Sequence, residues 1–525
     1  MIDVAIVGAG LTGLTLARQL LARGLSVAVF DARTRAGGRI LSDVDPAGGA
    51  TVDLGASWYW PDTEPRITAL IESLGLRSFD QPDSGQVLSL PDASRAPEPM
   101  DVNGIHGGAR RLSGGMGQLV QALVAQLPAG SLQLGHRVLS LIDCGTHIEL
   151  HVSVDLNDSP DVIQAKRFQA KRVVLALPPR LMLQSIRFQP ELPEATVEAM
   201  SQVSTWMARE AKSFMRYNKP FWLEAGHSGS AFVTHIQAVL REIWDASDEH
   251  GAALAGFHAI PPDARPHFER SMPMLVASQF GQLFGPEAQG DTVVTKDWAQ
   301  DAWTCSELDR QDPSTFPPQA SPILRRPHWG SRLFFGGTET ARQAAGHMEG
   351  ALESVARLSD FLRPVRQSTV QPAQHLEEAL SRFHQWVEAE RQQALPRYRQ
   401  HVNQMLSRQD RDRVTQRAVL ATVEQTYSRA LEQLSSLDMF ATDLGPSGQT
   451  ELTPKVLKAF SGFSKSFVDD ALAFNAGSCA LSNFQSEHRP DSDYLRAITA
   501  DLAAAWVEFA WSTNDLLNTQ SIQPH

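Results

Sequence analysis

Apolar runs alternate with helical patterns over the first 80 residues of the chain. The runs over residues 2–7 and 26–30 predict buried strands. Apolar positions at helical spacing predict a helix between them, over about 12–24, and a short helix over about 66–74. Strands that alternate with helices are typical of a parallel sheet with helices on both faces. We therefore expect the chain to open with a doubly wound α/β domain.

The middle of the chain favours further strands, most of them short. A polar passage rich in proline and glycine at 81–110 and a helix over 117–127 come first. Strand patterns then follow at 132–134, 138–143, 147–154 and 172–177. Strands at 211–217, 229–234 and 252–258 with an amphipathic helix at 264–284 predict a second sheet that covers a substrate. A buried strand entering a glycine turn at 333–339 and a helix to about 362 repeat the opening pattern.

A change of composition at 363–373, rich in proline, glutamine and serine, precedes a region without strand patterns. Apolar stripes predict helices near 375–393, 397–408, 411–436, 453–473 and 491–517. We expect an α-helical domain there, used for packing, for self-association or for binding a partner protein. A metal site in it is not expected, because the pairs Glu378/His384 and Glu487/His488 lack the helical spacing of ligands.

Composition narrows the class of protein. The 525 residues are 42% hydrophobic and 20% charged, as in ordinary globular proteins, and the net charge of −12 argues against nucleic acid or an anionic membrane as a partner. The three cysteines, Cys144, Cys305 and Cys479, form neither a disulfide framework nor a metal motif, which fits a reducing cytoplasm. The first strand leaves no room for a signal peptide, and no apolar run reaches about 18 residues. We therefore expect a cytoplasmic protein with no membrane segment.

The strongest chemical signal lies in the first 39 residues. The first strand runs into Gly8-Ala9-Gly10-Leu11-Thr12-Gly13, and the second strand ends on Asp31. A glycine turn at a helix N-terminus directs backbone N–H groups at a pyrophosphate, and an acidic residue at the tip of the second strand can accept a hydrogen bond from a ribose hydroxyl. Gly37-Gly38-Arg39 adds an arginine suited to a phosphate contact. These residues together predict a dinucleotide site.

Several separated motifs in residues 1–362 resemble those of the flavin-containing amine oxidases, the group of monoamine and polyamine oxidases. The glycine turn with Gly37-Gly38-Arg39 is similar to the FAD entry of that family, and Asp53–Trp58 is similar to its flavin-side loop. Gly114-Gly115-Met116 is similar to its Gly-Gly-Met turn, and the segments 335–339 and 346–351 are similar to its closing FAD motif. The helical region after residue 362 lies outside the resemblance.

The resemblance implies the amine oxidase fold, in which an FAD-binding Rossmann-like doubly wound domain carries a mixed-sheet substrate domain. We expect the FAD-binding domain at 1–80, 114–196 and 297–364 and the substrate-binding domain at 81–113 and 197–296. A linker at 365–374 and a C-terminal all-α domain at 375–520 would follow.

The same resemblance implies noncovalent FAD, because Cys305 is out of register with the cysteine that tethers flavin in some members. The residues it places on the cofactor are Gly8, Gly10, Leu11, Thr12, Gly13, Asp31, Arg33, Gly38, Arg39, Gly55, Ala56, Ser57, Trp58, Val138, Trp298, Gly337, Glu339, Met348 and Ala351.

Two residues are candidates for catalysis. Lys212 lies nine residues before Phe221-Trp222, which matches the active-site lysine of the family, and a lysine there would hold a water near the flavin N5. His347 occupies the position where many members have an aromatic-cage tyrosine, and a histidine can accept a proton or hydrogen-bond a polar substrate. This departure leaves the substrate class open.

The resemblance implies an FAD-dependent oxidoreductase that oxidises a small-molecule amine to an imine by hydride transfer, with O2 or another electron acceptor. Two alternatives stay open at this point. One is an FAD-dependent desaturase, dehydrogenase or isomerase that acts on a non-amine. The other is a non-enzymatic protein that works through its helical tail.

Overall fold

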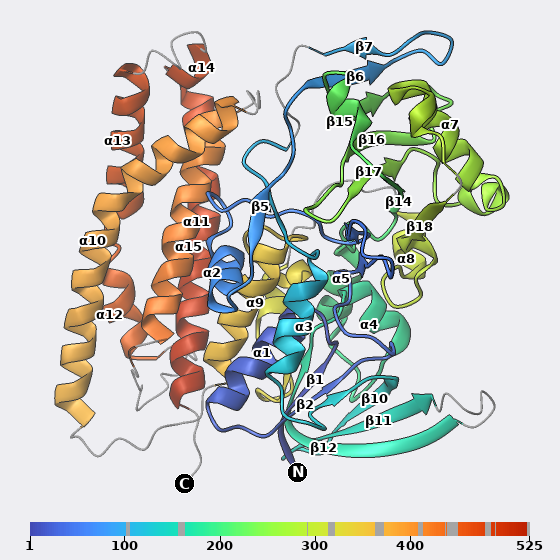
Figure 1. The fold of residues 1–525 in the computed structure, drawn as a ribbon. Coiled ribbons are helices and arrows are strands. Elements are labelled where there is room, and N and C mark those ends of the chain that lie inside the picture. Colours follow the sequence, from blue (N-terminus) through green and yellow to red (C-terminus); the bar gives the residue numbers. More distant parts are fainter. Residues whose placement is uncertain are drawn as a thin grey trace. The chain divides into compact units, whose positions relative to one another are not determined.

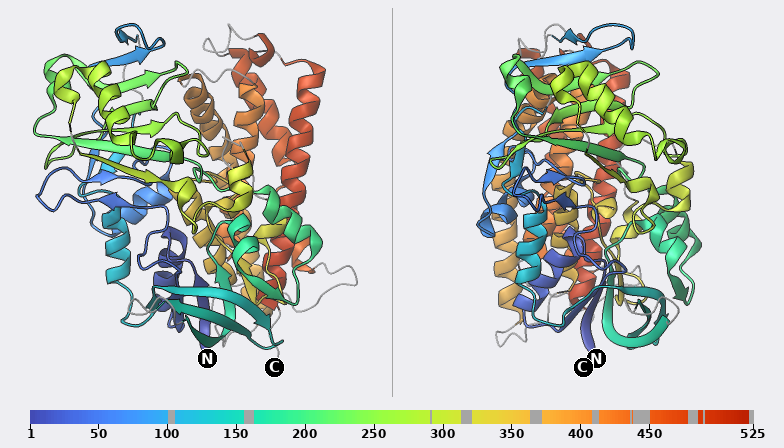
Figure 2. Two further views of the ribbon diagram at one scale, coloured as in Figure 1. Left: turned by 90° about the vertical axis from the view of Figure 1, so that its right-hand side faces the viewer. Right: turned by 45° about the vertical axis from the view of Figure 1, so that its right-hand side comes forward.

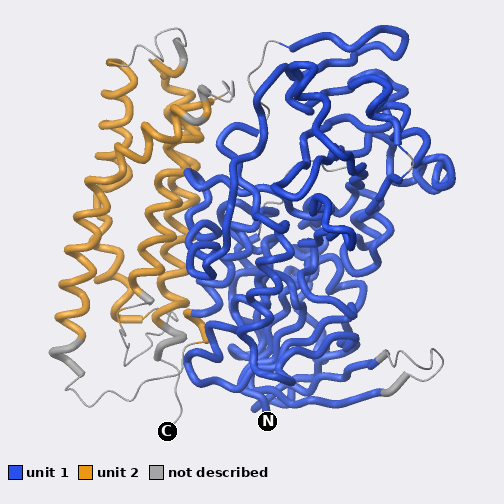
Figure 3. The backbone as a smooth tube through the Cα atoms, viewed as in Figure 1, with its two compact units in different colours: residues 1–359 blue, residues 360–525 orange. Residues whose placement is uncertain are grey.

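The computed structural model describes residues 1–100, 106–155, 163–290, 292–312, 321–362, 372–407, 413–435, 437, 450–477, 485–488 and 490–521. These residues form two compact units, 1–359 and 360–525, shown in different colours in Figure 3. Cys479, which the sequence analysis singled out, lies outside the described residues. No helix among the described residues is long and apolar enough to cross a membrane.

The first unit contains a large sheet built around its N-terminal strand. Its order is β13 (Arg187–Gln189), β10 (His136–Asp143), β11 (Ile148–Asp155), β12 (Ile163–Leu175), β1 (Ile2–Val7), β2 (Val27–Phe30) and β9 (Leu132–Gln133). β19 (Leu333–Phe335) also pairs with β12, in parallel. The C-terminal half of β12 therefore lies between β1 and β19, which brings the two ends of this unit's sequence side by side.

Parallel pairing of β1 with both β2 and β12 explains why β1, β2 and the C-terminal end of β12 are apolar. Val4 to Val7 are all buried, as expected for a strand with neighbours on both edges and layers on both faces. Helix α1 (Leu11–Ala22) connects β1 to β2 and buries Leu14, Leu16, Ala17 and Leu20. This β-α-β crossover places the α1 N-terminus at the carboxyl edge of the sheet, where ligands of such sheets bind.

The second large sheet lies at the opposite end of this unit (Figures 1 and 2). Its order is β18 (Val293–Asp297), β14 (Ala211–Tyr217), β17 (Ala252–His258), β16 (Leu240–Asp245), β15 (His227–Val233), β6 (Gln86–Leu90) and β7 (Glu98–Pro99). All pairs are antiparallel except β15 with β6. β14 carries Lys212, so this sheet fixes the position of that side chain.

Short strands and helices complete the first unit. Two small sheets pair β3 (Ser42–Asp43) with β4 (Val52–Asp53) and β5 (Ser78–Asp80) with β8 (Arg110–Leu112). The helices are α2 (Pro65–Ser73), α3 (Gly117–Ala125), α4 (Pro179–Ser185), α5 (Glu194–Gln202), α6 (Phe221–Glu224), α7 (Met272–Phe284), α8 (Glu307–Gln311) and α9 (Met348–Phe361), the last of which ends just beyond residue 359.

The second unit is helical throughout its described residues. It consists of α10 (Pro372–Ser407), α11 (Val414–Ser435), α12 (Leu452–Lys458), α13 (Phe463–Gly477), α14 (Gln485–His488) and α15 (Ser492–Ser521). Its core combines aliphatic and aromatic side chains, and Tyr427 stacks on Phe509 with 4.4 Å between ring centroids. Glu487 accepts hydrogen bonds from Thr415 N and Tyr494 Oη.

The helix predictions for this unit were wrong in two places. A break near Pro396 was expected, but α10 runs through it. A proline inside a helix costs about 3 kcal/mol, and the burial of Ala394 and Tyr398 on either side of it offsets that cost. One helix was expected over 453–473, but a turn at 459–462 separates α12 from α13, and Gly462, directly before α13, has φ +73° in the left-handed region.

In the first unit, the sequence patterns missed several strands, among them β6, β7, β16 and β18 of the second large sheet, and extended one helix too far. β16 has the sequence Leu-Arg-Glu-Ile-Trp-Asp, which lacks a strict alternation of polar and apolar residues, and its buried carboxylate Asp245 accepts a hydrogen bond from Trp222 Nε1. The helix expected over 264–284 is a 3-10 turn at Arg265–Phe268 followed by α7. Pro273, in the first turn of α7, favours a helix that starts there and not earlier.

Candidate active site

A cavity in the first unit collects residues from distant parts of the sequence. It has about 1420 Å³ of empty space, open solvent included. Its walls include the turn after β1, the loops 31–40 and 54–58 and the residues that follow β12. Strands β14 and β17, the segment after β18 and the turn before α9 also contribute. These segments belong to both large sheets, so the cavity joins the carboxyl edge of the first sheet to the face of the second.

The glycine turn after β1 needs glycine at two positions for packing. Gly8 has φ +108°, and a Cβ at Gly13 would lie 1.9 Å from Gly8 O, so helix α1 touches the turn directly. Gly13 therefore does not line the cavity, whereas Gly8, Gly10, Leu11 and Thr12 do. A Cβ at Gly10 would meet no atom within 4 Å, because this residue faces open space at the α1 N-terminus.

Asp31 is tied to the glycine turn by main-chain hydrogen bonds. Its Oδ2 accepts from Ala9 N at 2.8 Å, and its Oδ1 accepts from Arg33 N at 2.9 Å. Each carboxylate oxygen keeps a further lone pair, so Asp31 can both fix the turn and accept from a ribose hydroxyl. The Arg33 guanidinium forms an ion pair of 2.7 Å with Asp301 and donates to Thr304 Oγ1, which closes this end of the cavity.

Arg39 bridges the two halves of the cavity. Its guanidinium binds the Glu339 carboxylate with two contacts, of 2.6 and 3.0 Å, and Nη1 also donates to Trp206 O. Glu339 is fully buried, whereas about a quarter of the Arg39 side chain is exposed. A guanidinium has five N–H donors, so Arg39 keeps capacity for a phosphate oxygen while Glu339 fixes its plane.

Lys212 is buried, and its ammonium group lies against the loop of residues 53–58. Nζ donates to Gly55 O at 2.6 Å and to Ser57 Oγ at 2.8 Å. It also lies 5.0–5.4 Å from the ring centroids of Trp58, Trp244 and Phe257, within the range of cation–π attraction. These contacts orient Lys212 toward residues 55–57, which line the cavity with it.

Burial lowers the pKa of Lys212 from its ordinary value of 10.5 to about 8, and the Asp53 carboxylate opposes this shift. Between pH 8 and pH 10.5 the unfolded chain therefore binds more protons at Lys212 than the folded chain does. The free energy of unfolding consequently increases as the pH rises through this window. We expect the melting temperature of apoprotein to rise from pH 8 to pH 10.5 relative to that of Lys212→Met. Thermal melts of both proteins at several pH values test this, and a constant difference would contradict the pKa.

His347 lies on the cavity wall in the turn that precedes α9. Its Nδ1 is 3.1 Å from Glu64 Oε1, and Glu64 lies in the loop before α2. Thr338 Oγ1 donates to His347 O, and Gly346, with φ +87°, leaves room for Trp206, which a Cβ would meet at 2.6 Å. The expected position of His347 in the pocket wall thus agrees with the geometry, and its partner Glu64 was not anticipated.

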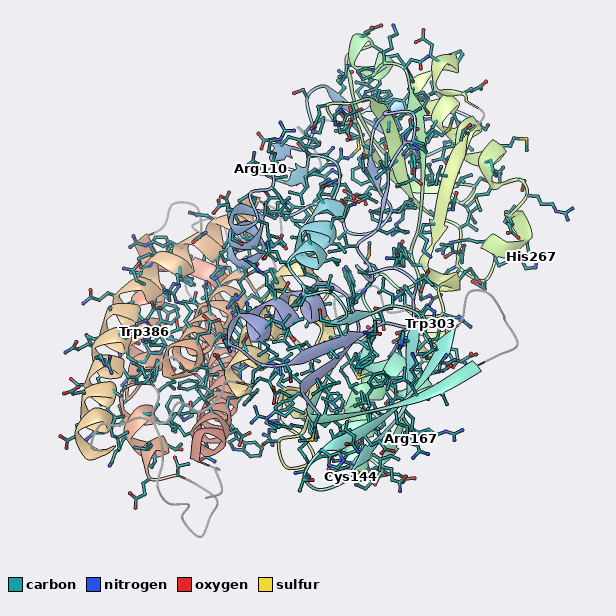
Figure 4. The ribbon with its side chains drawn as sticks, turned by 60° about the horizontal axis from the view of Figure 1, so that its bottom comes forward. Arg110, Cys144, Arg167, His267, Trp303 and Trp386 are labelled. Carbon is teal, nitrogen blue, oxygen red and sulfur yellow. The ribbon has the colours of Figure 1, made fainter. Side chains whose placement is uncertain are left out.

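The other expected cofactor residues fall into two groups. Gly38, Gly55, Ala56, Ser57, Trp58, Trp298, Gly337, Met348 and Ala351 line the main cavity. Val138 instead lines a smaller adjoining cavity, which shares Gly8, Asp31, Arg33 and Trp303 with the main one. Trp303, labelled in Figure 4, therefore belongs to both. Trp298 Nε1 donates to Leu54 O at 2.9 Å, which holds its ring beside the flavin-side loop.

Sequence reasoning did not single out several residues that line the cavity. They are Glu64, Met207, Glu210, Phe257 and Thr304. Glu64 had a weak signal, since it lies six residues after Trp58 and directly before the proline that opens α2. Phe257 had none, because only the pairing of β14 with β17 brings it beside Lys212. Glu210 lies two residues before Lys212, directly before β14, but no pattern marked it.

These residues fit a dinucleotide such as FAD. The open face of Gly10 leaves space beside a helix N-terminus, whose unpaired N–H groups attract a pyrophosphate. Cys305 is buried with Ala208 and Ala299 and does not line the cavity, and Cys144 (Figure 4) is exposed after β10. Among the described residues, no group of three or more histidine, cysteine, aspartate or glutamate side chains could hold a metal ion.

Comparison with known proteins agrees with this geometry. The family model for flavin-containing amine oxidoreductases matches residues 11–98 and 89–359. The chain is 25% identical over 453 residues to a putative flavin-containing monoamine oxidase, AofH, of Mycobacterium tuberculosis, covering 68% of this chain and 95% of the relative. It is 23% identical over 450 residues to human flavin-containing amine oxidase B, covering 68% of this chain and 85% of that enzyme.

Solved structures show the same fold. Cyclohexylamine oxidase from Brevibacterium oxydans superposes with a TM-score of 0.57 at 19% identity, over 69% of this chain and all of that one. Wild-type putrescine oxidase bound to putrescine gives 0.55 at 20% identity, over 68% and 98%. The expected family and the amine oxidase fold are thus confirmed, and the family model covers most of the first unit. The chain therefore belongs to the flavin-containing amine oxidoreductases and is an FAD-dependent enzyme of that family.

Proposed function

We propose that the protein oxidises a C–N bond of a small-molecule amine to an imine, with hydride transfer to N5 of noncovalently bound FAD and O2 as the electron acceptor. The first sheet then serves FAD binding and the second sheet serves substrate binding. The observation that carries the proposal is the placement of Lys212, whose Nζ is held at Gly55 O and Ser57 Oγ within the cavity wall.

Lys212 combines two properties that the reaction needs. Its ammonium form stabilises negative charge that develops on a nearby electron acceptor, because few water molecules reach a buried site to screen it. Its pKa of about 8 keeps the neutral and charged forms close in free energy near neutral pH. The side chain can therefore hold a water molecule by either donating or accepting a hydrogen bond.

The walls of the cavity favour an amine without a carboxylate group. Trp58, Trp206, Phe257 and Trp298 supply an aromatic lining. Recognition of a substrate carboxylate usually requires a guanidinium that can bind it in a bidentate manner. Among the lining residues that the structure describes, the two arginines are Arg33 and Arg39, and both are paired with carboxylates.

Anaerobic flavin reduction tests this function. We expect benzylamine, cyclohexylamine or putrescine to bleach the flavin absorbance of the purified protein, and air to restore it with formation of peroxide. Acid precipitation should release all of the FAD, because no cysteine lines the described cavity. Bleaching by non-amine substrates alone would favour a desaturase or dehydrogenase, and no bleaching by any substrate would favour a non-enzymatic role.

A further inference from the structure

The paired side chains of Glu64 and His347 form a second polar centre in the cavity. Glu64 is buried, and its Oε1 lies 3.1 Å from His347 Nδ1. The other oxygen, Oε2, accepts from Trp60 N at 2.9 Å, so the carboxylate cannot turn freely. The His347 side chain, in contrast, is 41% exposed, which leaves the imidazole accessible from the cavity.

This contact determines which imidazole nitrogen carries a proton. A carboxylate oxygen only accepts hydrogen bonds, so Nδ1 must be the donor. In the neutral imidazole, Nε2 then has a free lone pair. Among the polar side chains that the structure describes in the cavity wall, His347 supplies the basic nitrogen without a hydrogen-bond partner, since Lys212 Nζ is engaged by Gly55 and Ser57.

A third residue fixes the two elements that carry this pair. Glu349, in the first turn of α9, accepts hydrogen bonds from Arg66 N and Ile67 N at the α2 N-terminus. The Arg66 guanidinium adds an ion pair of 3.2 Å with the same carboxylate. Helices α2 and α9 (Figure 1) are therefore joined beside the pair, and the distance from Glu64 to His347 is set by this joint.

We propose that Glu64 and His347 act as a proton-accepting pair for the substrate. The inference rests on the proposed amine oxidation. His347 Nε2 takes a proton from the ammonium form of the amine: an N–H bond of the substrate breaks, an Nε2–H bond forms, and the electron pair stays on the amine nitrogen. Nothing is oxidised in this step. The neutral amine that results can donate its lone pair to the adjacent carbon when that carbon loses hydride.

Glu64 is a positioning residue in this scheme. It holds the Nδ1 proton, and its negative charge stabilises the imidazolium that forms when Nε2 takes a proton. The other charged groups of the cavity wall have partners of their own: Glu210 with Arg241, Arg39 with Glu339 and Arg33 with Asp301. The pair thus replaces, in this chain, the tyrosine that many family members have at position 347.

Chemical rescue tests the pair. The probe is whichever of benzylamine, cyclohexylamine and putrescine reduces the wild-type flavin fastest at neutral pH. We expect His347→Ala to lower the second-order rate constant of flavin reduction by about 100-fold, because the side chain that accepts the proton is missing. Added imidazole should restore much of the rate. Pyrazole, which has the same size but is a much weaker base, should not.

A double-mutant cycle tests the role of Glu64. We expect Glu64→Gln alone to lower the rate by about 10- to 100-fold, and to have no further effect in the His347→Ala protein. The matched control is His151→Gln, which breaks the surface pair of His151 with Glu149 and should leave the rate unchanged. FAD content and melting temperature check that each variant folds. If Glu64→Gln does not fold, the rescue of His347→Ala still decides the question.

Three results would overturn the inference. They are a wild-type rate in His347→Ala, equal rescue by imidazole and pyrazole, or additive effects of the two substitutions. A wild-type protein whose flavin no amine reduces would instead refute the proposed function itself.

Discussion

Gly10→Ala is expected to leave the protein folded and to weaken FAD binding by about 10- to 100-fold, which corresponds to about 1–3 kcal/mol of overpacking. Gly10 has φ −79° and ψ −173°, a conformation that alanine adopts without strain. The added methyl group would meet no protein atom within 4 Å. It would occupy the space in front of the α1 N-terminus, where the pyrophosphate must approach the backbone.

Titration of apoprotein with FAD, followed by flavin fluorescence, measures this effect. The matched control is Gly107→Ala, which also adds a methyl group in open space but lies outside the cavity walls. Its FAD affinity should equal that of the wild type. Unchanged FAD affinity in Gly10→Ala, with the control also unchanged, would show that the cofactor does not lie at this turn.

Lys212→Met is expected to lower the rate of flavin reduction or of reoxidation by about 100- to 1000-fold. Methionine fills most of the volume of the lysine side chain and packs against the rings of Trp58, Trp244 and Phe257. It removes the ammonium that stabilises developing charge and holds a water molecule. Gly55 O and Ser57 Oγ lose their donor, so the local hydrogen bonding changes while the fold persists.

Stopped-flow absorbance separates the two half-reactions: reduction is followed without oxygen, and reoxidation is followed after mixing with air. Lys219→Met is the control, since Lys219 is exposed and pairs with Glu224 at the surface. It should react at the wild-type rate. If Lys212→Met retains FAD and both half-reactions proceed normally, Lys212 has no catalytic role.

The half of the cavity that we propose for FAD was largely predictable from the sequence because its signals are local. Gly8, Gly10, Gly13 and Asp31 lie within one strand-turn-helix-strand unit, where the positive φ of Gly8 and the close approach of Gly13 to Gly8 O require glycine. The closing motif is equally local, since Gly337 and Glu339 follow β19 directly. Each of these residues is needed because of the local backbone path, which residues close in the sequence determine. The pattern can therefore be detected without knowledge of the fold.

The substrate end was less predictable because its residues meet only through strand pairing and helix docking. Phe257 lies beside Lys212 because β17 pairs with β14 in one particular register. Glu64 contacts His347 because hydrogen bonds from Glu349 hold α9 against the start of α2. No local pattern marks either encounter, and the missed strands β6, β7, β16 and β18 belong to this same sheet.

The amino-acid sequence by itself thus determined the family, the cofactor and the alternation that opens the first unit, because each depends on short-range backbone requirements. The tertiary structure alone decided how the cavity is closed: the Arg39–Glu339 bridge, the burial that lowers the pKa of Lys212, and the pairing of Glu64 with His347. These features depend on contacts between residues up to 300 positions apart. Burial strengthens these electrostatic interactions, and the burial of a residue cannot be inferred from its neighbours in the sequence.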